Sequence, residues 1–181
     1  DFTMGSSIID VFKEHTNLIS DYHLMVEEPS RLFDSFSITE NNIFTIHQEC
    51  SRNLHRDIIS LREKGAQVGV ALSPGTSLDT LEYIIEDLDV ILLMTVNPGY
   101  KGQPLVPQAV RKIANLKKII NEMNLNTKIS VDGNVNLNTI PEMVSSGADI
   151  LVLGSSGLFR KDISIMDAVE KIKISIDEGK K

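Results

Sequence analysis

The sequence predicts an α/β fold in which six parallel strands alternate with helices, as in a (β/α)8 barrel that lacks its first two strands. After one leading helical stretch, a short apolar run followed by an amphipathic stretch recurs six times along the 181 residues. Such alternation is typical of parallel strands joined by right-handed crossovers. Half of a doubly wound sheet would alternate in the same way, but the number of units and the shortness of the strands favour the barrel.

No linker, low-complexity tract or shift in composition divides the chain, so we expect residues 1–181 to form a single barrel domain. Barrels of this kind usually need about 200 residues or more. Six strand–helix units and a leading helix therefore indicate a domain that is incomplete at its N-terminus.

Each predicted strand is an apolar or alternating run that ends at a carboxylate or at turn-forming residues. The fourth run, for example, stops at Asn-Pro-Gly and the sixth at Gly-Ser-Ser-Gly. In order, the predicted strands are residues 18–26, 43–47, 67–72 and 90–96, a run ending at Asp132, and residues 149–153.

The predicted helices have an apolar face, a capping residue at the start and a glycine or cation near the end. Ser7 and Ser51 are the expected N-caps of two of them, and Pro29 suits the first turn of another. In order, the predicted helices are residues 8–16, 30–36, 52–64, 77–86, 108–123, 137–146 and 163–177.

Composition restricts the classes of function. The formal net charge is −7, aromatic residues make up 5% and Trp is absent, so no nucleic-acid surface is expected. Cys50 is the single cysteine, which rules out an intrachain disulfide and fits a reducing compartment. Without an apolar run of transmembrane length or a signal-peptide pattern, a cytoplasmic protein without membrane contact is expected.

Asp132 is the strongest candidate for chemistry. A carboxylate at the carboxyl end of a barrel strand projects to the face where ligands bind, and it can act as a general acid or base or as a metal ligand. The alternative is a turn residue that bonds the backbone before Gly133.

Histidines at two neighbouring strands are the next candidates. His23 shares one strand face with Asp21 and Met25, and imidazole together with carboxylate suits a divalent metal such as zinc or manganese. A satisfied core histidine is the alternative. His47 ends the next strand and is also a candidate metal ligand, although we expect a supporting or structural role for it.

Glycine-containing turns after the last two strands suggest a phosphate site. Gly154 and Ser155 follow the last strand, where barrels commonly hold phosphate with backbone N–H groups, and Gly133 lies in the preceding turn. No Gly-Lys-Ser/Thr follows, so this is not a Walker A loop. Met25 and Met94 are expected near the strand ends, where composition alone would make them core filler.

Four motifs stand in a defined order along the chain. They are His-Leu-Met-Val at 23–26, Met-Thr-Val-Asn-Pro-Gly-Tyr-Lys-Gly-Gln at 94–103, Val-Asp-Gly at 131–133 and Gly-Ser-Ser-Gly-Leu-Phe at 154–159. From about Phe2 to Phe159 their order and spacing resemble the ribulose-phosphate 3-epimerase family, for which the second motif is highly specific. The Ser-Gly-Leu-Phe ending and the run Asp-Gly-Asn-Val-Asn look closer to the allulose-6-phosphate 3-epimerase branch.

The resemblance implies a (β/α)8 barrel of the ribulose-phosphate-binding type that inverts C3 of a ketose phosphate. In this family two aspartates on opposite faces of the substrate exchange protons through an enediolate. One divalent metal ion, commonly zinc, with manganese, iron or cobalt as alternatives, is held by two histidines and the same two aspartates. A metal ion neutralises the developing oxyanion. The expected partners are the phosphorylated ketose and further copies of the chain in a homo-oligomer.

Carried over residue by residue, the resemblance makes His23 and Asp132 metal ligands and Asp132 one of the two acid/base groups. It implies substrate contacts at Met25, Met94, Gly99, Gly102, Gly133, Asn134, Gly154 and Ser155. Asn134 stands where the family usually has glycine, although its backbone N–H can still donate to phosphate. Lys101 replaces a small residue, and we expect either an added phosphate contact or plain solvent exposure.

The resemblance departs at the start of the chain. The family's first metal histidine and other catalytic aspartate lie on its second strand, and Asp1 does not match that aspartate. We therefore expect the intact protein to be longer. The alternatives are a non-catalytic phosphosugar-binding barrel and another phosphate-binding barrel lyase. A Schiff-base aldolase is disfavoured because no lysine stands at a strand end.

Overall fold

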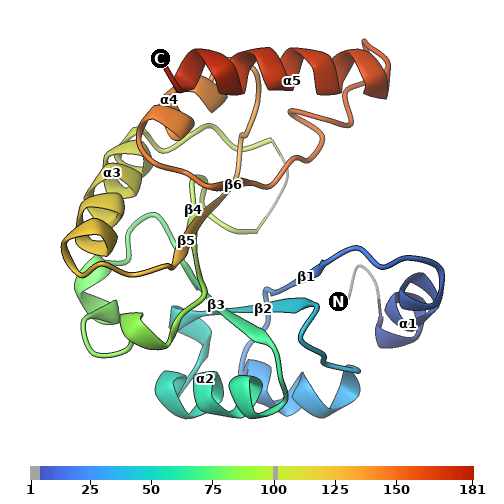
Figure 1. Cartoon of the computed structure of the whole chain (residues 1–181), viewed down its shortest axis with the longest axis vertical. Helices are drawn as coiled ribbons and strands as arrows, with labels where there is room; N and C mark the ends of the chain where they lie inside the picture. The colour runs from blue at the N-terminus through green and yellow to red at the C-terminus, as the bar shows by residue number, and fades with distance from the viewer. Residues whose placement is uncertain (1–4, 100–101) are drawn as a thin grey trace. The chain divides into compact units, whose positions relative to one another are not determined.

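The strands of the computed structural model follow one another in chain order. The structure describes residues 5–99 and 102–181, and within these ranges six strands form one sheet in the order β1-β2-β3-β4-β5-β6 (Figure 1). The strands are β1 Ser20–Leu24, β2 Asn42–His47, β3 Gln67–Leu72, β4 Val90–Met94, β5 Lys128–Asp132 and β6 Ile150–Leu151. β1 pairs with β2, and β5 with β6, in parallel. The predicted class, an α/β fold with strands in the order of a (β/α)8 barrel, is confirmed.

Helices alternate with these strands. The α-helices are α1 Ser6–His15, α2 Leu54–Glu63, α3 Pro107–Glu122, α4 Ile140–Ser145 and α5 Ile165–Gly179, and the 3-10 helices are η1 Pro29–Ser35, η2 Gln48–Cys50, η3 Leu78–Leu81 and η4 Ile85–Asp87. The described residues fall into two compact units. The N-terminal unit comprises residues up to 70 together with 87–90, and the C-terminal unit comprises residues 71–86 together with those from 91 onward. That the two form one barrel domain stays a prediction.

An aromatic cluster forms the core of the N-terminal unit. Tyr22 of β1 and Phe44 of β2 are register partners, and their rings stack with centroids 5.1 Å apart. Phe33 of η1 and Phe36 meet Phe44 edge to face. Aromatic pairs of this kind contribute about 0.5–1.5 kcal/mol beyond the area they bury. Because side chains alternate along a strand, the core on this face directs His23 to the opposite face of β1.

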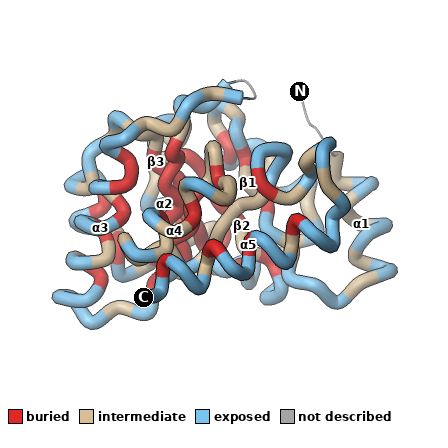
Figure 2. The backbone as a smooth tube through the Cα atoms, turned by 90° about the horizontal axis from the view of Figure 1, so that it is seen from above, coloured by how far each residue is buried: buried red, intermediate tan, exposed pale blue. Residues whose placement is uncertain are grey.

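The first helix covers none of this core. The predicted helix is present as α1, but among the described residues it has no buried member. Its apolar side chains Ile8, Val11 and Phe12 are 50–59% exposed. Figure 2 shows α1 without the buried colour that runs through the strands. The sequence pattern predicted the helix, but its expected N-cap is wrong, because Gly5 and not Ser7 occupies that position. Its apolar face is not buried among the described residues.

The C-terminal unit is built on β4, an entirely apolar strand that is buried along its length. α3 turns one apolar face inward, and its buried residues are Ala109, Val110, Ile113, Leu116 and Ile120. α4 and α5 pack side by side (Figure 1). Gly179 allows this approach, because a Cβ there would lie 2.5 Å from the carbonyl oxygen of Pro141.

The predicted helix at 77–86 is wrong. The structure has the short 3-10 helices η3 and η4 in this stretch. Ser77 Oγ accepts from Asp79 N at 3.2 Å, and Thr80 Oγ1 donates to the Ser77 carbonyl at 2.8 Å. Side chains that bond the backbone locally compete with the α-helical pattern, which explains the tighter turns. Likewise, the predicted helix at 30–36 is the 3-10 helix η1.

Several predicted ends also shift. α4 begins at Ile140 rather than near residue 137, because Asn136 forms a turn in which its Oδ1 accepts from Asn138 N at 2.9 Å. Ser51 is not the cap of α2: Asn53 occupies that position, and Ser51 Oγ donates to the buried Asp57 carboxylate at 2.6 Å. In the described part of the chain, no helix is long and apolar enough to cross a membrane.

Candidate active site

Asp132 ends β5 and is half-buried. Its backbone is fixed by Thr95, a fully buried residue just beyond β4. Thr95 N donates to the Asp132 carbonyl at 2.7 Å, and Thr95 Oγ1 lies 3.0 Å from the same oxygen. The hydroxyl also makes a short contact with the Gly133 carbonyl. These contacts hold the end of β5 against the end of β4, so the carboxylate is presented from a rigid support.

Gly133 leaves no room for a side chain. Its φ of +120° is a conformation that L-residues rarely adopt. A Cβ would lie 2.8 Å from Val96 N and 2.6 Å from Val96 Cγ2. The turn after Asp132 therefore brings its backbone into direct contact with the segment that follows β4.

The loop after β6 folds back on the same region. The carbonyl of Gly154 accepts from Leu158 N at 3.0 Å and from Phe159 N at 3.1 Å. Ser156 Oγ donates to the Val135 carbonyl at 3.1 Å, and the buried Gly157 packs against that oxygen. The two loops predicted to grip phosphate are thus adjacent within the C-terminal unit. Gly154 and Ser155 are themselves exposed.

The two predicted methionines differ in their surroundings. Met94 is buried and packs with Ala71, Leu92 and Val152 in the C-terminal unit, whereas Met25, at the end of β1, is 52% exposed. Of the predicted loop residues, Gly99 and Gly102 are exposed. Lys101 lies outside the described residues.

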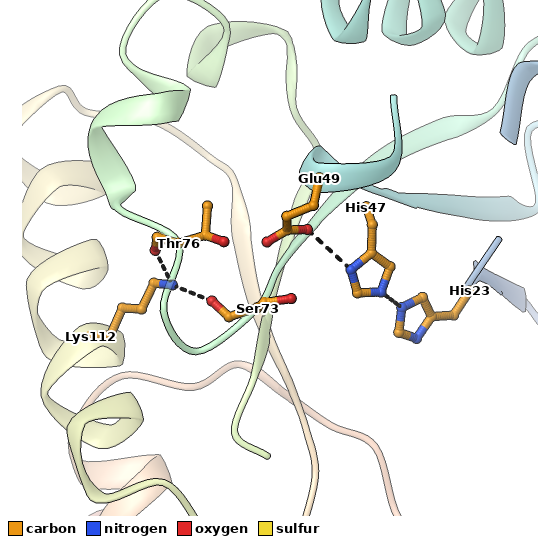
Figure 3. Close-up of polar contacts among 6 residues, drawn as sticks. All are labelled: His23, His47, Glu49, Ser73, Thr76 and Lys112. Atoms are coloured by element: carbon orange, nitrogen blue, oxygen red, sulfur yellow. Dashed lines mark hydrogen bonds and ion pairs between the residues drawn. The ribbon is translucent and has the colours of Figure 1, made fainter. Parts of the chain in front are cut away.

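In the N-terminal unit, His23 and His47 form a stacked pair. Their ring centroids are 5.0 Å apart and their planes differ by 16°. The two Nε2 atoms lie 2.8 Å apart, and His47 Nδ1 lies 3.4 Å from Glu49 Oε2 (Figure 3). A contact between two ring nitrogens needs one donor and one acceptor. If neutral His47 carries its proton on Nδ1, facing Glu49, then its Nε2 is the acceptor. His23 must then donate through its own Nε2. Neutral His23 then has its lone pair on Nδ1.

Residues 1–159 match the model of the ribulose-phosphate 3 epimerase family. This chain belongs to the ribulose-phosphate 3-epimerase family. The matched residues contain the ends of β1, β4, β5 and β6 described above.

Named relatives are consistent with this assignment. The ribulose-phosphate 3-epimerase of Bacillus subtilis is 39% identical over 155 residues, which cover 85% of this chain and 71% of the relative. The chloroplastic ribulose-5-phosphate-3-epimerase of Arabidopsis thaliana is 35% identical over 175 residues, 96% of this chain and 62% of the relative. The ribulose-phosphate 3-epimerase of Aquifex aeolicus is 35% identical over 161 residues, which cover 89% of this chain and 72% of the relative. The chain thus spans roughly two thirds of the length of these epimerases, and none of the three is named for allulose 6-phosphate.

Solved structures with little sequence identity share the fold. The 3-hexulose-6-phosphate synthase of Salmonella typhimurium matches with a TM-score of 0.57 at 18% identity, over 95% of this chain and 78% of that protein. A structure described as native KDPGal matches with a TM-score of 0.53 at 14% identity, over 97% and 73%. Both support the α/β barrel class.

Ribulose-phosphate 3-epimerases are generally metal-dependent. The side chains of this chain that could bind a divalent metal ion are therefore of interest. His23 and Asp132 are ligand types that divalent metals accept. They belong to different units, and within the described residues 5–99 and 102–181 no three or more His, Cys, Asp or Glu side chains are grouped to hold a metal ion. The described residues therefore do not form a complete metal centre by themselves.

Sequence reasoning missed the groups that fix the site. Thr95, Asn136 and Thr139 bond the turn after β5 but resemble ordinary loop residues in the sequence. A Thr directly after an apolar strand is a weak signal, and its partner is 37 residues away. His47 was predicted to have a supporting or structural role, and the structure places it beside His23.

Proposed function

We propose that the intact protein is a metal-dependent ketose-phosphate 3-epimerase that uses Asp132 as one of its two acid/base groups. The observation that carries the proposal is the end of β5. There, in a chain of the ribulose-phosphate 3-epimerase family, Thr95 bonds the backbone carbonyl of Asp132, whose half-buried carboxylate is followed by a glycine that no other residue can replace without strain.

In the proposed reaction, the Asp132 carboxylate takes the proton from C3 of the ketose, next to the carbonyl, and leaves an enediolate. A second carboxylic acid on the opposite face then returns a proton to C3, which inverts the configuration. In the reverse direction protonated Asp132 is the donor. A rigid support favours this role, because a base positioned within hydrogen-bond reach of its proton is more effective.

The other residues bind and orient the substrate. Backbone N–H groups of Gly133, Asn134, Gly154 and Ser155 would hold the phosphate, and the adjacency of their loops through Val135 supports this. Met25 and Met94 would line the enediolate, and Gly99 and Gly102 belong to the loop proposed to contact the substrate. His23 and Asp132 would bind the metal ion, for which zinc is our first choice. When bound, this ion supplies positive charge to the developing oxyanion.

The Asp132→Asn variant tests the proposal. It keeps the size of the side chain but removes its basicity, so we expect epimerisation of ribulose 5-phosphate to fall by at least about 10³-fold, a typical range for loss of an acid/base group. Calorimetry should show binding of inorganic phosphate within about twofold of the unsubstituted protein. Turnover retained by this variant would remove Asp132 from the mechanism.

A phosphosugar-binding protein without catalysis is the second candidate. The contact between the turns at Gly133 and Gly154 through Val135 supports phosphate binding, which this candidate shares with the enzyme. A protein that binds ribulose 5-phosphate but never exchanges its C3 proton would fit this candidate.

The substrate branch and the assembly are finer proposals. The run Asp-Gly-Asn-Val-Asn at the end of β5 and the Ser-Gly-Leu-Phe turn after β6 favour allulose 6-phosphate. The names of the relatives favour a ribulose phosphate, and the Arabidopsis relative is named for ribulose 5-phosphate. Parallel assays with both sugars would decide, because the preferred one will have the larger kcat/KM. We also propose a homo-oligomer.

A further inference from the structure

Asn134, two residues after Asp132, has more contacts than its backbone conformation requires. Its φ of +50° lies in the left-handed region, which glycine and asparagine adopt most readily. The resemblance described above places glycine here in most of the family, and glycine would satisfy the backbone alone. The asparagine side chain is therefore available for another purpose.

Both ends of the Asn134 amide are engaged. Its Oδ1 accepts from Asn136 Nδ2 at 2.5 Å, and the same Asn136 amide donates to the Asn134 carbonyl at 2.9 Å. Because Asn136 holds the oxygen end, the NH2 group of Asn134 is directed to the Gln103 carbonyl, 3.2 Å away. Thr139 Oγ1 donates to the Asn134 carbonyl at 2.8 Å.

These bonds join parts of the C-terminal unit that are distant in sequence. Asn136 and Thr139 precede α4, and Gln103 precedes α3. Val106, three residues after Gln103, donates to the Thr95 carbonyl at 2.9 Å. Thr95 in turn bonds the carbonyl of Asp132. The turn at 133–134 is thus tied on one side to β4 and on the other, through Asn134, to residue 103.

We propose that the Asn134 side chain is a positioning device that pre-orients the backbone N–H groups of the 133–134 turn for the substrate's phosphate. The inference rests on the proposed phosphate site at this turn and goes beyond it, since it assigns a role to a side chain rather than to an N–H group. A turn with a glycine at this position has more backbone freedom to lose when the anion binds. In this chain, the bonds to Asn136 and Gln103 restrict that freedom before binding.

The test is Asn134→Gly, which keeps the positive φ without strain and removes only the side-chain bonds. Asn124→Gly is the matched control, because Asn124 also has a positive φ of +54° but is exposed at the end of α3. Hydrogen exchange in the absence of ligand should be faster for amides 133–139 in Asn134→Gly only. KM for ribulose 5-phosphate and the Kd for inorganic phosphate should rise about three- to tenfold, with kcat within about twofold, because the two lost side-chain bonds act on the phosphate only through the turn.

A double-mutant cycle with Asn136→Ala separates positioning from general damage. If the two amides act as one unit, the double variant should raise KM little more than Asn134→Gly alone. Unchanged exchange at 133–139, or a KM equal to that of Asn124→Gly, would overturn the inference. If the unsubstituted protein bound no phosphate, the proposed phosphate site would fail and this role of Asn134 with it. Faster exchange in Asn134→Gly would then show only that the side chain orders the turn.

Discussion

Gly133 is the residue at which the turn after β5 is least tolerant of change. Gly133→Ala would place a Cβ within 3 Å of Val96 in a backbone conformation disfavoured for L-residues. We expect a loss of about 2 kcal/mol or more in the free energy of unfolding, within the range for backbone strain and overpacking. Urea denaturation followed by circular dichroism measures this value.

Gly154→Ala is the control for that substitution. No described atom lies within 4 Å of the position its Cβ would take, and Gly154 is not among the described glycines with positive φ. We expect the free energy of unfolding to change by less than about 0.5 kcal/mol, as for most surface substitutions. Equal destabilisation by the two alanines would contradict the steric account of Gly133.

Glu49 is expected to act on the metal through His47 and His23. If Glu49 keeps the proton on His47 Nδ1, then Glu49→Gln allows the opposite tautomer and leaves His23 Nδ1 protonated and unable to bind metal. Zinc affinity, measured by competition with a chromophoric chelator, should fall about tenfold, the lower end for outer-shell partners. Glu63→Gln, at an exposed position of α2, should leave the zinc affinity unchanged. Equal zinc affinities of the two variants would refute the role given to Glu49.

Among the helices and strands, the bounds were predicted most accurately for the elements whose apolar residues are buried in a regular pattern. β3 and α3 were predicted to within a residue, because an uninterrupted apolar run and a regular apolar face identify them. The helix predicted at 77–86 failed because Ser77 and Thr80 bond the local backbone, which hydrophobic periodicity does not report. Of the candidate site residues, the motifs indicate Asp132, Gly133 and His23. The tie from Asn134 to Gln103 could not, because it joins loops 31 residues apart.

Lys112 holds α3 to the loop after β3. Its Nζ donates to the carbonyls of Ser73 at 2.9 Å and Thr76 at 2.5 Å (Figure 3). Lys112→Met keeps much of the packing but removes these charged bonds, so we expect a loss of about 1–3 kcal/mol in the free energy of unfolding. Thermal and urea unfolding measure it.

Lys118→Met on the same helix is the comparison for Lys112. Lys118 is 74% exposed, and its Nζ lies 3.7 Å from Glu122 Oε1. A pair so exposed contributes little because solvent screens it. If both methionine variants unfolded at the same urea concentration, the role given to Lys112 would be wrong.

For the whole molecule, the exposed apolar side chains of the N-terminal unit need an explanation. Ile8, Val11 and Phe12 of α1 are joined by Leu18 and Ile19 before β1, all at least half exposed. Exposed apolar side chains that gather in a patch often mark contact surfaces. We expect the purified protein to be an oligomer. Light scattering coupled to size-exclusion chromatography measures its molar mass, and a mass equal to that of one chain would contradict this expectation.

The central claim is that this family member exchanges the C3 proton of a ketose phosphate through Asp132. The most direct measurement is proton NMR of ribulose 5-phosphate in D2O with the purified, zinc-loaded protein. We predict that the C3 proton signal disappears while xylulose 5-phosphate labelled with deuterium at C3 accumulates, and that Asp132→Asn stops both. A C3 signal that stays intact with ribulose 5-phosphate and with allulose 6-phosphate, although the sugar binds, would contradict the epimerase account and leave a phosphosugar-binding protein.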